Sequence, residues 1–235
     1  MVEIKTAEQP FNNQGDFAKH RDEKGNISVG SSHVGQSPFP EYLPTWNETE
    51  HYKPLQFFKH EDKGKLADSR FPNLLPEGRV NLKALTPKFG SEIKGIQLSE
   101  LSNAGKNEVA LLAAQRGVLV FRDQDLFVKG PKYAKEYGSY FGPLHIHQTS
   151  GAPNGHPEIH VVYHKEDDQE QKVDFHSRRN KNSSVYWHSD VTYELQPPGT
   201  TFFGILEIPL EGVVILCSLT PLKLTTVYHQ NFRKD

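Results

Sequence analysis

The sequence predicts an α+β domain whose core is an incomplete jelly roll (double-stranded β-helix) with flanking helices, preceded by a disordered N-terminal tail. Short segments rich in β-branched and aromatic residues alternate with Gly, Pro and Asn clusters, a pattern typical of strands and turns. Two segments have the composition of helices. A jelly roll needs about eight strands. Strand-like segments number about five or six here, so the predicted core is incomplete.

The composition indicates a soluble protein with no strong charge bias. The 235 residues carry a formal net charge of -2 at pH 7, which gives no reason to expect nucleic acid or an anionic membrane as a partner. Cys217 is the single cysteine, so no disulfide is expected within the chain and a reducing, cytoplasmic location is predicted. The first residues lack the apolar stretch of a secretory signal.

Composition divides the chain into four parts. Residues 1–40 are polar and are predicted to form the disordered tail, because they cannot bury enough apolar surface to fold. Residues 41–78 are an extended segment with prolines and aromatic residues, which either wraps across the folded domain or serves as a linker. Residues 79–212 are predicted to be the folded domain, and residues 213–235 an aberrant tail.

The folded domain is expected to begin with a β-hairpin. Residues 80–85 and 92–96 have the composition of short strands. Pro87 and Gly90 lie between them and mark the turn that would join the two strands.

A helix, a strand and a second helix follow. Residues 108–116 are rich in strong helix formers, with Ser99 as the expected cap and Gly117 as the expected end. Residues 117–122 form an apolar run that predicts a buried strand. Residues 132–141 predict another helix with its aromatic side chains on one face, ended by a glycine.

The second half of the domain is predicted to be mainly β-structure. Residues 158–163, 185–193 and 200–208 are strand-like, and residues 196–199 form a Pro-Pro-Gly turn. The charged segment 165–182 is longer than most connections in compact domains, so it is expected to be a mobile loop or a lid.

His188 and Asp190 are the strongest candidates for a metal site. Both lie in the predicted strand 185–193, and side chains two residues apart in a strand point to the same face. An imidazole and a carboxylate side by side are two of the three ligands of a 2-His-1-carboxylate facial triad, which holds non-haem Fe(II). By spacing alone this motif is common, so its flanking residues matter.

The residues around this motif resemble the taurine/sulfonate dioxygenases, the TauD/TfdA-like family that depends on Fe(II) and 2-oxoglutarate. The likeness runs from residue 85 to 209 with the motifs in family order. The matching segments are the string Trp-His-Ser-Asp-Val-Thr-Tyr at residues 187–193 with Pro-Pro-Gly at 197–199, and residues 85–90, 93–96, 120–124 and 141–147.

The resemblance implies roles for five residues. His188 and Asp190 match the first two iron ligands, and no catalytic residue beyond the metal ligands is implied. His147 matches a histidine that binds the substrate sulfonate, and an imidazole N–H suits an anion. Val191 and Tyr193 fall where the family lines its substrate pocket.

The implied reaction consumes O2 and 2-oxoglutarate at Fe(II), hydroxylates the carbon next to sulfur and releases sulfite. The implied substrate is a small sulfonate or a related organic acid. Ser184 and Ser150 stand where the bacterial taurine enzyme has an amide and a tyrosine. Taurine and other small acids therefore stay open as substrates.

The resemblance ends near Gly212. Family members continue with Gly-Gly-Asp-Thr, whose threonine binds 2-oxoglutarate, whereas Ile215 or its neighbour falls at the threonine position here. A one-base shift of the reading frame after Gly212 permits Gly-Gly-Asp-Thr, so residues 213–235 are interpreted as a frame-shifted tail. His229 is too close to His188 in sequence to match the distal iron ligand. The expectation is an impaired enzyme without that histidine, the threonine and the arginine clamp.

Two alternatives belong to other functional classes. One is a non-catalytic fragment that associates with an intact subunit, or forms a homo-oligomer, through an open sheet edge. The other is a metal hydrolase whose ligands are His145, His147, His188 and Asp190.

The other histidines have a simpler interpretation. Without the family, His145 and His147 fit a half-exposed strand with one ring packed and one solvated. The remaining histidines of this region are expected at the surface or in loops: His156, His160, His164 and His176.

Overall fold

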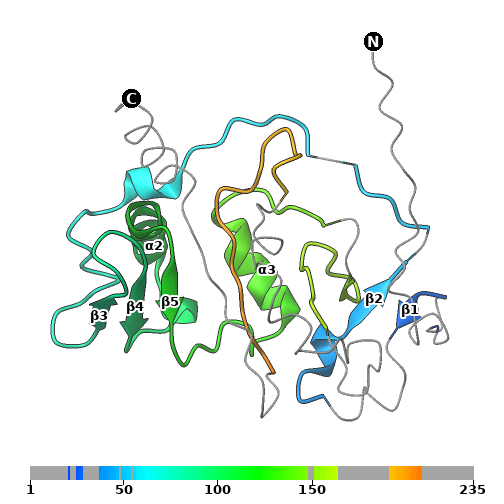
Figure 1. The fold of residues 1–235 in the computed structure, drawn as a ribbon, viewed down its shortest axis with the longest axis horizontal. Coiled ribbons are helices and arrows are strands. Elements are labelled where there is room, and N and C mark those ends of the chain that lie inside the picture. Colours follow the sequence, from blue (N-terminus) through cyan, green and yellow to red (C-terminus); the bar gives the residue numbers. More distant parts are fainter. Residues whose placement is uncertain are drawn as a thin grey trace, which may run out of the picture. The chain divides into compact units, whose positions relative to one another are not determined.

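The computed structural model describes residues 21, 25–28, 37–47, 49–53, 55–147, 151–163 and 191–207. These residues form six short strands, two α-helices and three 3-10 helices (Figure 1). The strands are β1 (Ile27–Ser28), β2 (Pro44–Trp46), β3 (Asn81–Ala84), β4 (Ser91–Lys94), β5 (Leu119–Phe121) and β6 (Ala152–Pro153). The helices are η2 (Pro40–Tyr42), η3 (Lys63–Leu66), η4 (Leu98–Glu100), α2 (Asn103–Arg116) and α3 (Pro131–Ser139).

The chain divides into two compact units, with the boundary inside α3. Unit 1 contains the sheet β1-β2-β6, and unit 2 contains the sheet β3-β4-β5 together with α2. Unit 1 comprises Met1–Phe58, Gly130–Lys135 and Pro143–Thr201, and unit 2 comprises Lys59–Lys129, Glu136–Gly142 and Phe202–Asp235. No helix among the described residues is long and apolar enough to cross a membrane.

The sheet of unit 2 combines a hairpin with a parallel strand. β3 and β4 pair antiparallel from Asn81↔Lys94 to Ala84↔Ser91, which confirms the predicted hairpin. β5 pairs with β4 in parallel, because the chain returns through α2 between them (Figure 1). A jelly roll is built from antiparallel strands, so this parallel pair departs from the predicted core. β5 is also half-buried rather than buried.

Aliphatic side chains from the sheet and α2 form the core of unit 2. Ile93 of β4 is fully buried, and Val109 and Leu112 of α2 are buried as well. Leu98, which precedes α2 in the chain, and Leu126, which follows β5, are also buried and add to this core. Burying a side chain of this size stabilises a fold by about 1.5–3 kcal/mol, so this apolar cluster contributes to the stability of the unit.

Helix α2 starts five residues before the predicted helix. Its N-cap is Ser102, whose Oγ accepts a hydrogen bond from the backbone N–H of Gly105 at 3.3 Å. The expected cap Ser99 lies instead in η4, so that expectation is wrong. The first turns contain Asn and Gly, which are weak helix formers. Tyr140 supports them by donating a 2.7 Å hydrogen bond to Asn107 Oδ1.

The end of α2 agrees with the sequence prediction. Gly117 has φ 75° and its N–H donates to the carbonyl oxygen of Ala113 at 2.7 Å. A left-handed residue at this position is the usual helix stop, and glycine adopts it without steric cost.

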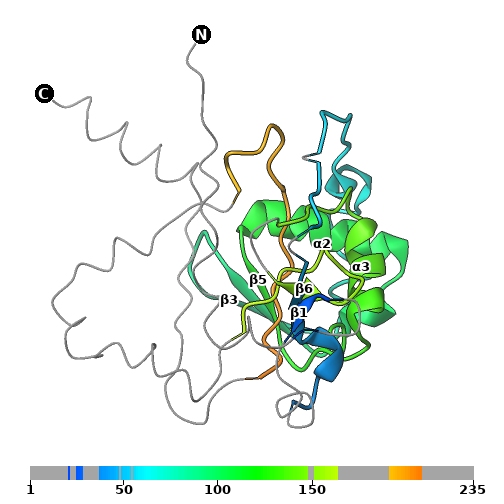
Figure 2. The same ribbon diagram turned by 90° about the vertical axis from the view of Figure 1, so that its right-hand side faces the viewer.

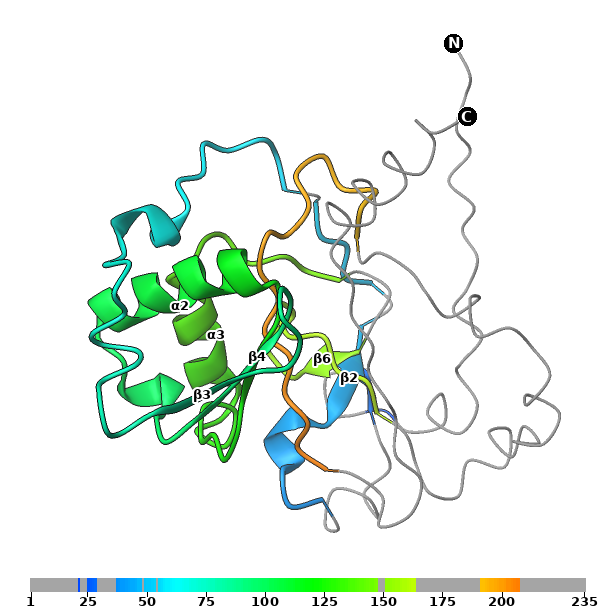
Figure 3. The same ribbon diagram turned by 60° about the vertical axis from the view of Figure 1, so that its left-hand side comes forward.

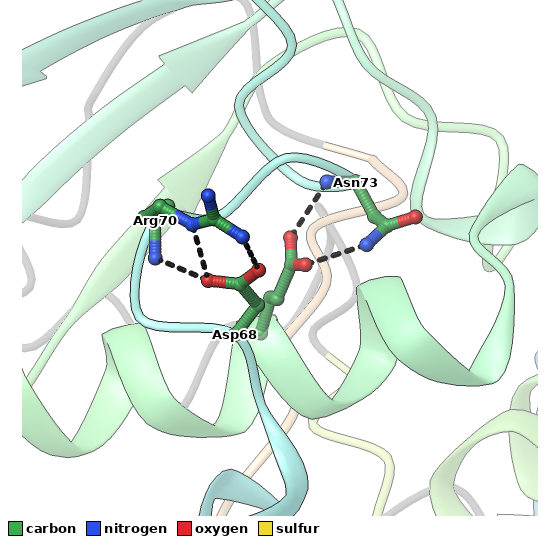
Figure 4. A network of polar contacts seen from close by, with 4 residues as sticks. Asp68, Arg70 and Asn73 are labelled. Carbon is green, nitrogen blue, oxygen red and sulfur yellow. Dashed lines mark hydrogen bonds and ion pairs between the residues drawn. The ribbon is translucent and has the colours of Figure 1, made fainter.

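The carboxylate of Glu108 is fully buried on α2 and accepts three hydrogen bonds. The backbone N–H and the side-chain Nδ2 of Asn73 donate to Oε2 at 2.9 Å and to Oε1 at 2.6 Å (Figure 4). The backbone N–H of Leu74 donates to Oε2 at 2.6 Å. In the same loop, the exposed pair Asp68–Arg70 joins at 2.8 Å. The guanidinium of Arg70 lowers the pKa of Asp68 to about 2 through its hydrogen bonds. The three hydrogen bonds of Glu108 fix this irregular loop to α2.

The sheet of unit 1 contains residues that the sequence analysis places in the tail and in the extended segment. Ile27 of β1 pairs with Trp46 of β2, and β2 pairs antiparallel with β6 (Figure 3). Figure 2 shows β1 and β6 of the same sheet. Ile27 is only 3% exposed, and Tyr42 of η2 is also buried. The expectation of disorder is therefore wrong for Ile27–Ser28, because Ile27 is buried and both residues pair with β2.

Helix α3 ends two residues before the predicted boundary and carries an aromatic cluster. The rings of Tyr137 and Phe141 lie 5.7 Å apart, and each contacts Phe202, at 5.6 and 5.1 Å between centroids. Edge-to-face and tilted ring pairs of this kind add about 0.5–1.5 kcal/mol beyond their buried area. These contacts confirm the predicted aromatic face for Tyr137 and Phe141.

Three predicted strands are not strands where the structure describes them. Residues 158–163 are irregular, residues 191–193 form a turn, and residues 200–207 are extended without pairing in a sheet. Alternating apolar residues favour a strand only when a partner edge is available. The predicted loop 165–182 and the tail 213–235 lie outside the described residues.

We predict that Glu108→Ala destabilises the protein by about 2 kcal/mol or more, because the buried backbone N–H of Leu74 and the part-buried backbone N–H of Asn73 lose their acceptor. Glu108→Gln is expected to cost less, since its amide oxygen still accepts from both groups. Chemical denaturation measures both effects, with the exposed Glu77→Ala as control. An unchanged midpoint for Glu108→Ala would contradict this role.

Candidate functional site

The residue predicted to bind the substrate anion, His147, belongs to a cluster of three imidazole rings. His147 is half-buried in the irregular segment 143–147. Its ring centroid lies 4.6 Å from that of His160 with an interplanar angle of 35°, and 6.5 Å from that of His145. All three residues belong to unit 1. Neighbouring imidazoles can present N–H donors to one anion.

His145 joins this cluster to a segment far away in the sequence. Its Nε2 lies 3.0 Å from Oε1 of Glu194, and the two side chains are 16% and 11% exposed. A hydrogen bond to a carboxylate is stronger than a neutral one, and low exposure protects it from water and salt. The contact therefore fixes residues 143–147 to the turn that carries Glu194.

That turn has an unusual backbone. Val191 has φ 44°, in the left-handed region, and its carbonyl oxygen accepts a hydrogen bond from the N–H of Glu194 at 3.1 Å. A β-branched residue in this conformation costs on the order of 1–3 kcal/mol. Tyr193, inside the turn, is 75% exposed. The turn therefore needs support from outside, and the hydrogen bond between His145 and Glu194 supplies it.

The segment that carries His160 is held by the sheet of unit 1. The N–H of Val161 donates to the carbonyl oxygen of Gly151 at 3.0 Å. Thr45 Oγ1 of β2 donates to the carbonyl oxygen of Ala152 at 3.1 Å. Lys135 pairs with Glu158 at 3.3 Å. These bonds connect the irregular residues 154–163 to β2 and α3, so His160 lies on a supported loop.

The iron ligands proposed from the sequence, His188 and Asp190, lie outside the described residues. No group of three or more His, Cys, Asp or Glu side chains within the described residues is suited to hold a metal. An iron site therefore needs further residues, and Asp190 directly precedes Val191 of the described turn. The metal hydrolase alternative needs His188 and Asp190 as well.

The sequence predicts His147 as a site residue but does not predict that His160 contacts its ring or that Glu194 binds His145. His160 was expected at the surface, and it is exposed, yet its ring stacks on His147. Glu194 was not singled out at all. Its only sequence signal is its place four residues after Asp190, because nothing in the sequence connects it to His145.

A cavity of about 370 Å³ lies elsewhere in unit 1. Pro40, Leu43 and Pro44 form part of its apolar wall, and Asn154 and His156 contribute polar atoms. None of the residues predicted to bind metal or substrate lines this cavity. The functional assignment therefore relies on the histidine cluster and its hydrogen bond to Glu194.

Residues 81–218 match the model of the family described as taurine catabolism dioxygenase TauD, TfdA family. The chain is 47% identical over 191 residues to the alpha-ketoglutarate-dependent sulfonate dioxygenase of Saccharomyces cerevisiae, covering 80% of this chain and 46% of that protein. It is 42% identical over 186 residues to the alpha-ketoglutarate-dependent dioxygenase cnsP of Penicillium expansum, covering 79% and 49%. The chain thus spans about half the length of these relatives.

We predict that Gly151→Ala destabilises unit 1 by about 1–3 kcal/mol through overpacking. An added Cβ would lie 2.6 Å from the ring of Trp46 and 2.7 Å from Pro44. Thermal unfolding measures the effect. Gly199→Ala is the matched control, since nothing lies within 4 Å of its added Cβ. Equal stability of the two variants would show that the packing around Gly151 relaxes freely.

Proposed function

The chain belongs to the TauD/TfdA family of dioxygenases, and from this premise we propose that it is an Fe(II)- and 2-oxoglutarate-dependent dioxygenase that acts on a small sulfonate. The yeast relative is a sulfonate dioxygenase by name, which supports the substrate class. The proposed catalytic domain covers residues 79–212, with the double-stranded β-helix of the family as its core. O2 is the second co-substrate.

The observation that carries this proposal is the hydrogen bond between His145 and Glu194. It holds the segment of His147, the proposed sulfonate-binding residue, against the turn that begins directly after Asp190, the proposed iron ligand. An anion-binding group and a metal ligand need to be near each other if the carbon next to the sulfonate is to react.

The residues of this chain have separate tasks in the proposed reaction. His188 and Asp190 would hold the iron, as an imidazole and a carboxylate suit Fe(II). Iron with bound 2-oxoglutarate supplies the hydroxylating chemistry through oxidative decarboxylation. His147 donates an N–H to a sulfonate oxygen and orients the substrate, while Val191 and Tyr193 are the proposed pocket-lining residues.

The release of sulfite follows from the product of hydroxylation. A hydroxyl group on the carbon that bears the sulfonate gives an α-hydroxysulfonate. Loss of the hydroxyl proton forms a carbonyl group as the carbon–sulfur bond breaks, and sulfur leaves with the bonding electrons as sulfite. The residues Ser150 and Ser184 differ from the bacterial taurine enzyme, so the proposal covers small sulfonates and not taurine alone.

We predict that the purified protein binds Fe(II) under anaerobic conditions and that His188→Ala lowers the bound iron strongly, because one proposed ligand is lost. Metal analysis after gel filtration measures the iron content. His176→Ala is the matched control, a histidine expected in the preceding loop. Iron content that is the same in both variants would contradict the proposed ligand.

We predict that His147→Ala raises KM for a small sulfonate about 10- to 100-fold, as expected for losing a hydrogen bond to a charged group. Succinate and sulfite formation with Fe(II), 2-oxoglutarate and O2 measures turnover, with the exposed His51→Ala as control. Turnover without any effect of His147→Ala would remove this residue from the proposed site. Iron binding without turnover would support the expectation of an impaired enzyme or the alternative of a non-catalytic fragment.

A further inference from the structure

Glu194 and His145 form a charged hydrogen bond that the proposed chemistry does not itself use. The 3.0 Å contact lies between two side chains that are less than one-fifth exposed. An ionised carboxylate only accepts hydrogen bonds, so Nε2 of His145 carries the donated proton. The contact therefore sets both the orientation and the tautomer of the His145 ring.

Fixing the His145 ring also fixes His147. The two residues are two apart in a short irregular segment, and their rings meet edge-on at 6.5 Å between centroids. The ring of His147 also lies 4.6 Å from that of His160, with an interplanar angle of 35°. The backbone N–H of Val161 donates a 3.0 Å hydrogen bond to the carbonyl oxygen of Gly151, and this bond supports the segment that carries His160. The ring of His147 is thus held between an anchored imidazole and a supported one.

The same contact supports the turn at residues 191–194. Val191 holds a left-handed conformation that is unfavourable for a β-branched side chain. The hydrogen bond from Glu194 to Val191 closes the turn. Because the Glu194 side chain is hydrogen-bonded to His145, the turn is fixed relative to residues 143–147.

We infer that Glu194 is a positioning residue that acts through His145 to place His147 for a sulfonate. It touches neither substrate nor iron in this assignment, and the role in sulfonate binding rests on the proposed function. The chemistry that it serves is the recognition of a monovalent anion by an imidazole N–H held at a fixed orientation.

A double-mutant cycle tests whether the two residues act as one unit. Glu194→Ala, His145→Ala and the double variant are compared by the KM and kcat for taurine and ethanesulfonate, and by the Kd for each from ligand-observed NMR. Each single variant is expected to raise KM and Kd about 10-fold or more. The double variant should match the single ones. Additive effects would overturn the inference.

Glu194→Gln separates positioning from a general loss of structure. Its amide oxygen can still accept from His145, so Kd should stay within about 3-fold of the wild type. Glu77→Ala, at an exposed site, is the control for a lost carboxylate. A Kd for Glu194→Gln that equals that of Glu194→Ala would contradict positioning through the hydrogen bond.

NMR of the imidazole groups decides the inference without substrate. In protein labelled with ¹⁵N-histidine, His145 should be protonated at Nε2 in the wild type and in Glu194→Gln. Glu194→Ala should change the His145 tautomer signal and shift the His147 resonances. Unchanged His147 resonances would overturn the inference. If these NMR results are obtained but the wild type binds no sulfonate, the proposed function is overturned while the positioning role of Glu194 stands.

Discussion

The buried carboxylate of Glu108 is the interaction on which unit 2 depends. It accepts three hydrogen bonds from Asn73 and Leu74, and none of its surface reaches solvent. A carboxylate in this position is unfavourable unless every lone pair that faces the protein has a donor. The loop before β3 therefore has one position relative to α2, and α2 in turn covers the sheet that starts with β3.

Unit 1 uses a carboxylate in a comparable way at the candidate site. Residues 143–147 and 191–194 have no regular hydrogen-bonded structure of their own. The hydrogen bond between His145 and Glu194 replaces the support that a sheet would provide. Side-chain hydrogen bonds can hold an irregular segment in one orientation when they are shielded from water, which a substrate-binding histidine requires.

The sequence predicted the elements whose signals are local. The β3–β4 hairpin, the helix at α2 and the stop at Gly117 each follow from residues within a few positions of the element. The start of α2 was missed because its support comes from Ser102 and from Tyr140, which is distant in the sequence. The segments 158–163 and 200–207 have strand-like composition but no partner strand among the described residues, so propensity alone misled the prediction.

The amino-acid sequence alone identifies the family of this protein and its candidate residues, because the motif at residues 187–193 and the histidine at position 147 are recognised from the order of the residues. The tertiary structure decided which groups meet: β1 with β2, Glu108 with a distant loop, His147 with His160, and His145 with Glu194. These contacts join residues that are far apart in the chain. Their formation depends on burial and on hydrogen-bond partners in three dimensions, which no local pattern contains.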